Sequence, residues 1–199
     1  MADASSMIQQ APLQDRDLLT RMSLYFEGLD QRLRQGQGWL IFNADGARMQ
    51  RIAGYIDARL RQDFPEVFTH SMLWRDVAIS AYVSEVGLGE LKPGGAPTGN
   101  GTDVEKREYD LAKRITEDTC ERMAFSDLLV LVGLRPTTWH EATFVDKMID
   151  ERYRKRLATI LLTQQMPQAL EAAFDGLDPS KTFWPRLFGR MYETSLVAL

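Results

Sequence analysis

The sequence contains very little cysteine and histidine. Its single cysteine, Cys120, excludes an intrachain disulfide and any zinc site that is built from several thiolates. The two histidines, His70 and His140, have no carboxylate beside them at a metal-ligand spacing, so no metal site is expected. The nucleophile elbow Gly-x-Ser-x-Gly is also missing, which argues against a serine hydrolase of that kind.

Long hydrophobic runs and an excess of positive charge are missing as well. No apolar stretch approaches the roughly 20 residues that a membrane-spanning helix needs. The N-terminal segment MADASSMIQQ has neither the basic start nor the apolar core of a signal peptide, so we expect a cytoplasmic protein without membrane contact. A net charge of −4 disfavours unspecific attraction to nucleic acid, although a local basic patch could still bind it.

The composition is typical of one globular α/β domain. Hydrophobic residues make up 44% of the 199 residues and charged residues 26%, which suits a single packed core. Strand patterns at 39–42, 67–69, 127–132, 158–163 and 195–199 alternate with helical patterns. This alternation predicts a three-layer fold, with a parallel sheet and helices on both faces.

Two segments are expected to lie outside this core. Residues 1–14 read as a flexible tail, followed by an amphipathic helix over 15–34 that Asp15 could cap, so that 1–37 form an N-terminal unit before a domain of 38–199. The segment 87–102, GLGELKPGGAPTGNGT, is rich in glycine and proline and is expected to be a flexible loop.

The stretch WLIFNADGARMQ, residues 39–50, has the outline of a phosphate-binding loop. An apolar strand leads into a small polar turn and then into a helix with Met49, Ile52, Ile56 and Leu60 on one face. This is the setting in which Walker A loops occur. The same chain also carries an apolar run, FSDLLVLVGL, and a helix that ends in IDERYRKRLATILLTQQMP.

On these motifs the chain resembles the ATPase domain of the DnaC/IstB-type helicase loaders, a branch of the AAA+ P-loop proteins. The resemblance covers about residues 38–190 and includes FWPRLFGRMYETS, which is similar to the family's Pro-Arg-Leu-x-x-Arg element near the subunit boundary. It implies a P-loop NTPase-like fold and a role with DNA.

The resemblance also shows where the chemistry of such a site is missing. The loop positions read Asn43, Ala44, Asp45, Gly46, Ala47, Arg48, Met49 and Gln50. Met49 therefore stands at the position of the phosphate-binding lysine, and Gln50 at that of the magnesium-binding hydroxyl. Asp45 would repel phosphate at close range.

The remaining site positions agree with this reading. Val132 and Gly133 stand at the positions of the Walker B acidic pair, and Gln164 stands at the sensor position. The resemblance therefore implies that nucleotide binding has been lost. No catalytic residue, cofactor or metal is expected, and an enzyme is disfavoured.

A binding or regulatory subunit is the function that this combination implies. It would act in DNA replication, transposition or mobile-element helicase loading, with a helicase or an active AAA+ subunit as its protein partner. Arg186 and Arg190 occupy the family's arginine-finger region and are candidates for a subunit interface; a surface ion pair is the alternative. A homo-oligomer is compatible with this reading.

The basic run Arg152-Tyr-Arg-Lys-Arg156 is open to two interpretations. Arg152, Arg154, Lys155 and Arg156 could contact nucleic acid, or they could complement the dipole at the end of a helix.

Two alternatives to the inactive subunit also remain open. One is a divergent ATP-binding or ATP-hydrolysing protein in which Arg48 replaces the lysine and Asp127 or Glu141 holds the metal. The other is a scaffold of P-loop shape that has no connection with DNA.

Overall fold

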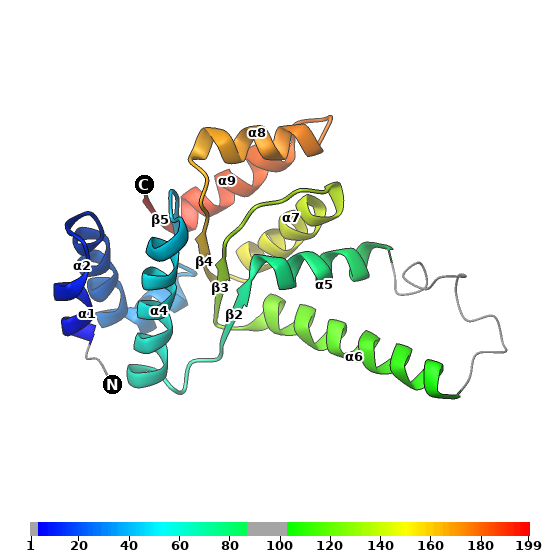
Figure 1. Cartoon of the computed structure of the whole chain (residues 1–199), viewed down its shortest axis with the longest axis horizontal. Helices are drawn as coiled ribbons and strands as arrows, with labels where there is room; N and C mark the ends of the chain where they lie inside the picture. Colours follow the sequence, from blue (N-terminus) through cyan, green and yellow to red (C-terminus); the bar gives the residue numbers. More distant parts are fainter. Residues whose placement is uncertain (1–3, 87–102) are drawn as a thin grey trace.

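A five-stranded parallel sheet forms the centre of the molecule (Figure 1). The computed structural model describes residues 4–86 and 103–199. The strands lie in the order β2-β3-β4-β1-β5, and each neighbouring pair is parallel. Their bounds are β1 Gly38–Ile41, β2 Thr69–Leu73, β3 Leu128–Val132, β4 Ala158–Leu162 and β5 Ser195–Ala198.

The three central strands β3, β4 and β1 are buried along their whole length, which explains their continuous apolar sequences. Successive side chains alternate between two core clusters: Trp39 and Ile41 face one cluster, whereas Leu40 and Phe42 face the other. Helices cover both faces, so the predicted α/β class and three-layer arrangement are confirmed.

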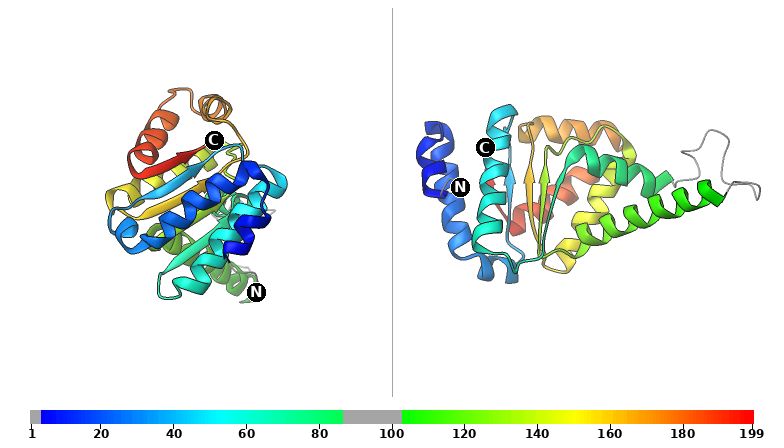
Figure 2. Two further views of the ribbon diagram at one scale, coloured as in Figure 1. Left: turned by 90° about the vertical axis from the view of Figure 1, so that its left-hand side faces the viewer. Right: turned by 60° about the horizontal axis from the view of Figure 1, so that its bottom comes forward.

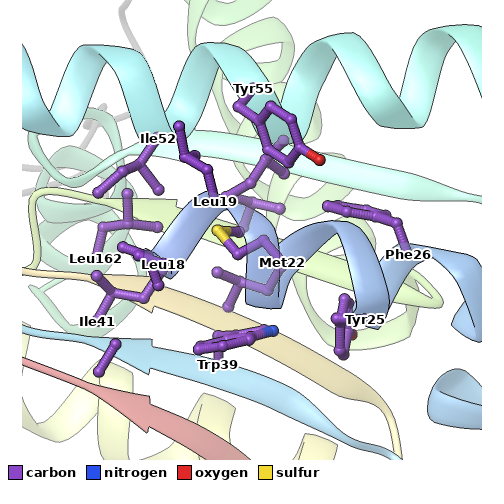
Figure 3. Close-up of a cluster of buried hydrophobic side chains, with 14 of the residues drawn as sticks. Leu18, Leu19, Met22, Tyr25, Phe26, Trp39, Ile41, Ile52, Tyr55 and Leu162 are labelled. Atoms are coloured by element: carbon purple, nitrogen blue, oxygen red, sulfur yellow. The ribbon is translucent and has the colours of Figure 1, made fainter. Parts of the chain in front are cut away.

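The N-terminal segment packs into one of these clusters. Its helices are α1 Ala4–Gln10, α2 Leu13–Glu27 and α3 Leu29–Arg34, and α4 Gly46–Asp63 lies beside them (Figure 1). Figure 3 shows Leu19, Met22 and Phe26 of α2 between Trp39 of β1 and Tyr55 of α4. Apolar side chains at helical spacing thus join α2 to the sheet.

Two predictions for this segment are wrong. Residues 4–14 are no tail, because α1 forms and Ala11 is buried in the core. The helix expected over 15–34 is broken at Gly28 into α2 and α3, and it begins at Leu13 with Pro12 rather than Asp15 at its N-cap position. The division of the chain at residue 37 stays a prediction.

The second face of the sheet carries the remaining helices. They are α5 Trp74–Val86, α6 Asp103–Phe125, α7 Trp139–Arg154, α8 Pro167–Leu177 and α9 Phe183–Thr194. Figures 1 and 2 show α5 and α6 extending together away from the sheet. Helix α7 begins at Trp139 behind an N-cap, because the Thr138 hydroxyl accepts the N–H of Glu141.

Strand β2 lies further along the chain than the sequence predicts. The expected strand 67–69 overlaps it at Thr69 only, and the strand continues through Met72 and Leu73. The register against β3, with Leu73 opposite Val132, fixes this position of the strand. The expected loop at 87–102 lies outside the described residues.

The turn before β1 requires glycine. Gly36 has a φ of +67°, a conformation that favours glycine and that ends α3. A β-carbon on Gly38 would lie 1.8 Å from the carbonyl oxygen of Thr159 in β4. Gly36 therefore ends α3, and Gly38 lets β1 and β4 approach closely.

Candidate functional site

The loop between β1 and α4 lies at the carboxyl edge of the sheet, where ligands bind in open α/β folds. It is short, because α4 begins at Gly46. The N–H of Asn43 donates to the carbonyl of Gln165 at 3.2 Å, and the N–H of Ala44 donates to the carbonyl of Thr163 at 2.9 Å. These two amides therefore point to the end of β4 and are not available to a phosphate.

Arg48 lies over this loop and binds protein groups on three sides. Its Nη1 donates to the carbonyl of Asn43 at 2.7 Å, and its Nη2 to the carbonyl of Leu199 at 3.2 Å. Its Nε donates to the carboxylate of Asp15 at 3.1 Å. Only 11% of the Arg48 side chain is exposed, so the guanidinium is part of the packed structure.

Asp15 accepts from a second arginine as well. Arg51, one turn further along α4, donates from Nε at 3.0 Å and from Nη2 at 2.5 Å to the same carboxylate. The Asp15 side chain is fully buried. Two guanidinium groups around one buried carboxylate thus fasten α2 to the start of α4.

The other positions of the expected phosphate site carry no phosphate-binding group. Met49 packs against the apolar core, and its sulfur lies 3.6 Å from the point where a β-carbon on Gly133 would stand. Asp45 and Gln50 are exposed. Asp45 is the N-cap residue of α4, but its side chain makes no capping hydrogen bond.

A crevice of about 440 Å³ opens at the carboxyl ends of β2, β3 and β4. Val132, Gly133 and Gln164 line it, so the two expected Walker B positions and the sensor position do meet in space. Its one carboxylate, that of Glu141, accepts from the N–H and the hydroxyl of Thr137 at 2.8 and 3.0 Å. Arg135, which the sequence reading missed, also lines this crevice.

The structure contradicts Asp127 as a metal ligand beside Arg48. Asp127 precedes the first residue of β3 and therefore lies at the amino edge of the sheet, opposite the β1–α4 loop. Its carboxylate accepts the N–H of Phe68 at 3.0 Å. Among residues 4–86 and 103–199, no group of three or more histidine, cysteine, aspartate or glutamate side chains could hold a metal ion.

Arg186 and Arg190 both reach across from α9 to α7. Arg186 Nη2 lies 2.8 Å from Asp146, while Arg190 lies 3.3 Å from Asp146 and 2.5 Å from Asp150. Burial raises the pKa of the Asp146 carboxyl, although both arginines act to lower it. Arg186 keeps 46% of its side chain exposed, so it is the freer of the two.

Solved structures share this arrangement of strands and helices. The crystal structure of the DnaC helicase loader superposes with a TM-score of 0.60 at 13% identity, covering 95% of this chain and 92% of that one. The chain has the fold of the DnaC helicase loader. The replication initiator DnaA, bound to AMPPCP and single-stranded DNA, gives a TM-score of 0.59 at 15% identity.

The two comparisons differ in extent. The match to DnaA also covers 95% of this chain, but it covers only 47% of the DnaA chain. No protein-family model and no curated protein matches the sequence. The likeness therefore concerns the DnaC-like fold, which the motifs at 39–50 and 125–134 predicted.

The basic run at the end of α7 contains one buried arginine and three exposed cations in this DnaC-like fold. Arg152 is 1% exposed and donates to carbonyls of Met123, Ser126 and Ala158, so the prediction that it contacts nucleic acid is wrong. Burial lowers the pKa of Arg152 to about 10.

The other three cations of the run are exposed. Arg154 pairs with Asp150 at 2.6 Å, and Lys155 pairs with Glu151 at 2.6 Å. Arg156 has a φ of +53° in the turn before β4. A nucleic-acid contact through Arg154, Lys155 and Arg156 stays a prediction.

The sequence reading missed Asp15 and Arg51 as partners of Arg48. Asp15 precedes Arg48 by 33 residues and Arg51 by 36, and no local pattern links positions so far apart. One signal was available in the sequence: Asp15 lies on the buried face of α2, among Leu18, Leu19 and Met22, and a buried carboxylate needs cationic partners.

Within the described ranges, no helix is long and apolar enough to cross a membrane.

Proposed function

We propose that the protein is a AAA+-type binding subunit that works without hydrolysing ATP. The observation that carries this proposal is Arg48: this cation in the first turn of α4 is already bound to Asp15, Asn43 and Leu199. The short loop and the apolar contacts of Met49 support the same conclusion. In this proposal, contacts within the protein fill the phosphate site, and the charged groups of the Walker A and Walker B motifs have been lost as a consequence.

We place this activity in DNA replication or a related process such as transposition or helicase loading. The support is the likeness of the whole fold to a helicase loader and to a replication initiator. The partner would be a helicase or an active AAA+ subunit, and the protein would act in the cytoplasm. In such a complex Arg186, which is half exposed, could leave Asp146 and bind an acidic or phosphate group of the neighbour.

Thermal unfolding with and without millimolar ATP and Mg²⁺ tests the loss of nucleotide binding. A ligand that binds only the folded protein stabilises it by about 2.7 kcal/mol at 100 times its Kd, which would raise Tm by several degrees in a chain of this size. We expect no shift. A P-loop ATPase with an intact Gly-Lys-Thr motif, measured in the same buffer, is the positive control.

A clear increase of Tm would favour the divergent ATP-binding protein instead. Arg48→Met would then separate the two explanations. If Arg48 binds phosphate, the variant loses the increase, whereas a structural Arg48 leaves any nucleotide effect unchanged and lowers Tm in the absence of nucleotide.

The DNA contact requires its own experiment. Fluorescence anisotropy with labelled single-stranded DNA at 50 and 200 mM salt would show binding that weakens with salt if phosphates are contacted. Exchange of Arg154, Lys155 and Arg156 for glutamine should reduce it, while the same exchange at the exposed Arg61 on α4 is the matched control. Binding that is equal in both variants would remove the basic run from the proposal.

A further inference from the structure

Strand β2 forms an open edge of the sheet. The carbonyl of Phe68 accepts from the N–H of Asp127 at 2.8 Å, which directs the backbone of residue 68 toward β3. Backbone groups alternate in direction along a strand, so His70 and Met72 also face β3. Thr69, Ser71 and the N–H of Leu73 therefore point away from the sheet.

These outward groups have no protein partner in the part of the chain that the structure describes. Edge strands are commonly protected by lysine, proline or a covering side chain. The sequence of β2, THSML, contains neither a charged residue nor proline. At the opposite edge, by contrast, Arg21 Nη2 lies 3.5 Å from the outward carbonyl of Val197 in β5.

A cavity of about 440 Å³ lies beside the open edge, between β2 and α4. Thr69 and Ser71 line it on the strand side, and its apolar lining consists of Ala53, Ile56, Leu60, Phe64, Pro65, Val67 and Val130. Leu73, at the carboxyl end of the same strand, is 44% exposed. Asp57 and Arg61 complete the lining, so the edge offers unpaired backbone, a recess of mixed polar and apolar character and an exposed apolar side chain.

We propose that β2 pairs in antiparallel fashion with β2 of a second copy, around a two-fold axis at Ser71. The five-residue strand is self-complementary in this register, since its outward residues are the first, the third and the fifth. Ser71 lies opposite Ser71, and Thr69 lies opposite Leu73, so every outward residue meets an outward residue. The two sheets become one continuous sheet.

The side chains fit the same register. Leu73 of each copy lies opposite Thr69 of the other, and Thr69 lines the cavity between β2 and α4. No two like charges face each other, because the strand is uncharged. This interface is independent of the proposed function and would hold whether or not nucleotide binds.

Sedimentation velocity over a range of protein concentrations measures the assembly directly. We expect a reversible dimer, and Ser71→Lys should weaken it about 100-fold or more, because two ammonium groups would meet at the axis. Gln14→Lys, an exposed substitution on α2, is the matched control and should leave the dimer unchanged. Circular dichroism would verify that both variants fold.

A disulfide at the axis fixes the register. Ser71→Cys should form a covalent dimer on mild oxidation, since residues directly opposite in this pairing have Cα atoms about 5.5 Å apart, within disulfide range. The wild-type chain with Cys120 alone and Gln14→Cys are the controls. A monomer at all concentrations would overturn the proposal, and so would a dimer that resists Ser71→Lys and gives no Ser71→Cys cross-link.

Discussion

Two buried aspartates each bind a pair of arginines, but their surroundings differ. Asp15 is fully buried, and its partners Arg48 and Arg51 come from one helix, α4. Asp146 lies nearer the surface on α7, and its partners Arg186 and Arg190 come from α9. Arg48 is nearly inaccessible, whereas almost half of the Arg186 side chain meets solvent.

This difference shows which cations remain available to a partner. Breaking a buried ion pair from one side leaves a charge that water cannot reach, which makes such pairs fixed parts of the structure. Exposed pairs stabilise a fold by at most about 1 kcal/mol and exchange partners easily. Arg48 therefore belongs to the framework, whereas Arg186 keeps exposed surface that a partner could reach.

Removal of the segment before β1, with α1, α2 and α3, should have the largest effect. A chain that begins at residue 38 loses the buried Leu18, Leu19, Met22 and Phe26, and each large apolar side chain contributes roughly 1.5–3 kcal/mol by burial. Their sum is comparable to the whole stability of a domain. We expect an unfolded chain by circular dichroism; a cooperative unfolding transition would instead support the division at residue 37.

Substitution of Asp15 itself should come next. Asp15→Asn keeps the shape but leaves Arg48 and Arg51 without their counter-charge, at a cost of about 3 kcal/mol in the free energy of unfolding. Urea denaturation measures it. Asp17→Asn, an exposed position on the same helix, is the matched control and should change stability by less than about 0.5 kcal/mol. Equal effects of the two substitutions would contradict the comparison.

Asp146→Asn should have a much smaller effect, and one that depends on pH. The pKa of Asp146 is raised in the folded protein from its ordinary value of 3.8, so between pH 3.8 and the raised pKa the folded state holds a proton that the unfolded chain releases. The contribution of Asp146 is therefore present below pH 3.8 and is lost as pH rises through the raised pKa.

The variant consequently gains relative to wild type as pH increases. At neutral pH we expect Asp146→Asn to cost less than about 1 kcal/mol, since Arg190 keeps Asp150 as a partner. Differential scanning calorimetry from pH 3.5 to 7 would show the difference in Tm moving in favour of the variant. If the difference in Tm instead moves in favour of the wild type as pH rises, the two arginines lower the pKa of Asp146 by more than burial raises it.

Arg186→Ala should have the smallest effect on stability, about 0.5 kcal/mol or less, because the pair is half exposed. This substitution distinguishes a structural role of Arg186 from a role in binding a neighbouring subunit. If Arg186 binds a neighbouring subunit, the variant keeps its Tm but loses affinity for the partner in a surface-plasmon assay. Arg48→Ala should show the opposite pattern: its Tm falls, whereas its affinity for the partner shows no loss that is specific to the interface.

The elements that could be predicted from sequence are those with strong local patterns. The apolar runs of β3 and β4 both lie where expected. The break at Gly28 and the position of β2 were missed. A single glycine in a helical pattern is often tolerated, and THSML fits a strand only through its register with β3.

The candidate site, too, could be predicted from sequence only in part. Sequence alone predicted that Met49, Val132 and Gly133 stand where phosphate and magnesium chemistry would need a lysine and two carboxylates, and this assignment stays a prediction. It could not tell that Arg152 is buried while Arg154 is exposed two positions later. Burial depends on which helix and which strand pack against the run.

Local order therefore determined the class of the fold, the alternation of strands with helices and the absence of standard phosphate-binding groups. The tertiary structure decided the partners of the charges: Asp15 with Arg48 and Arg51, Asp146 with Arg186 and Arg190. Backbone propensity and apolar period act over a few residues, so they can be read along the chain. Ion pairs between distant helices form only when the packing of the core brings them within about 3 Å, and no local pattern records that distance.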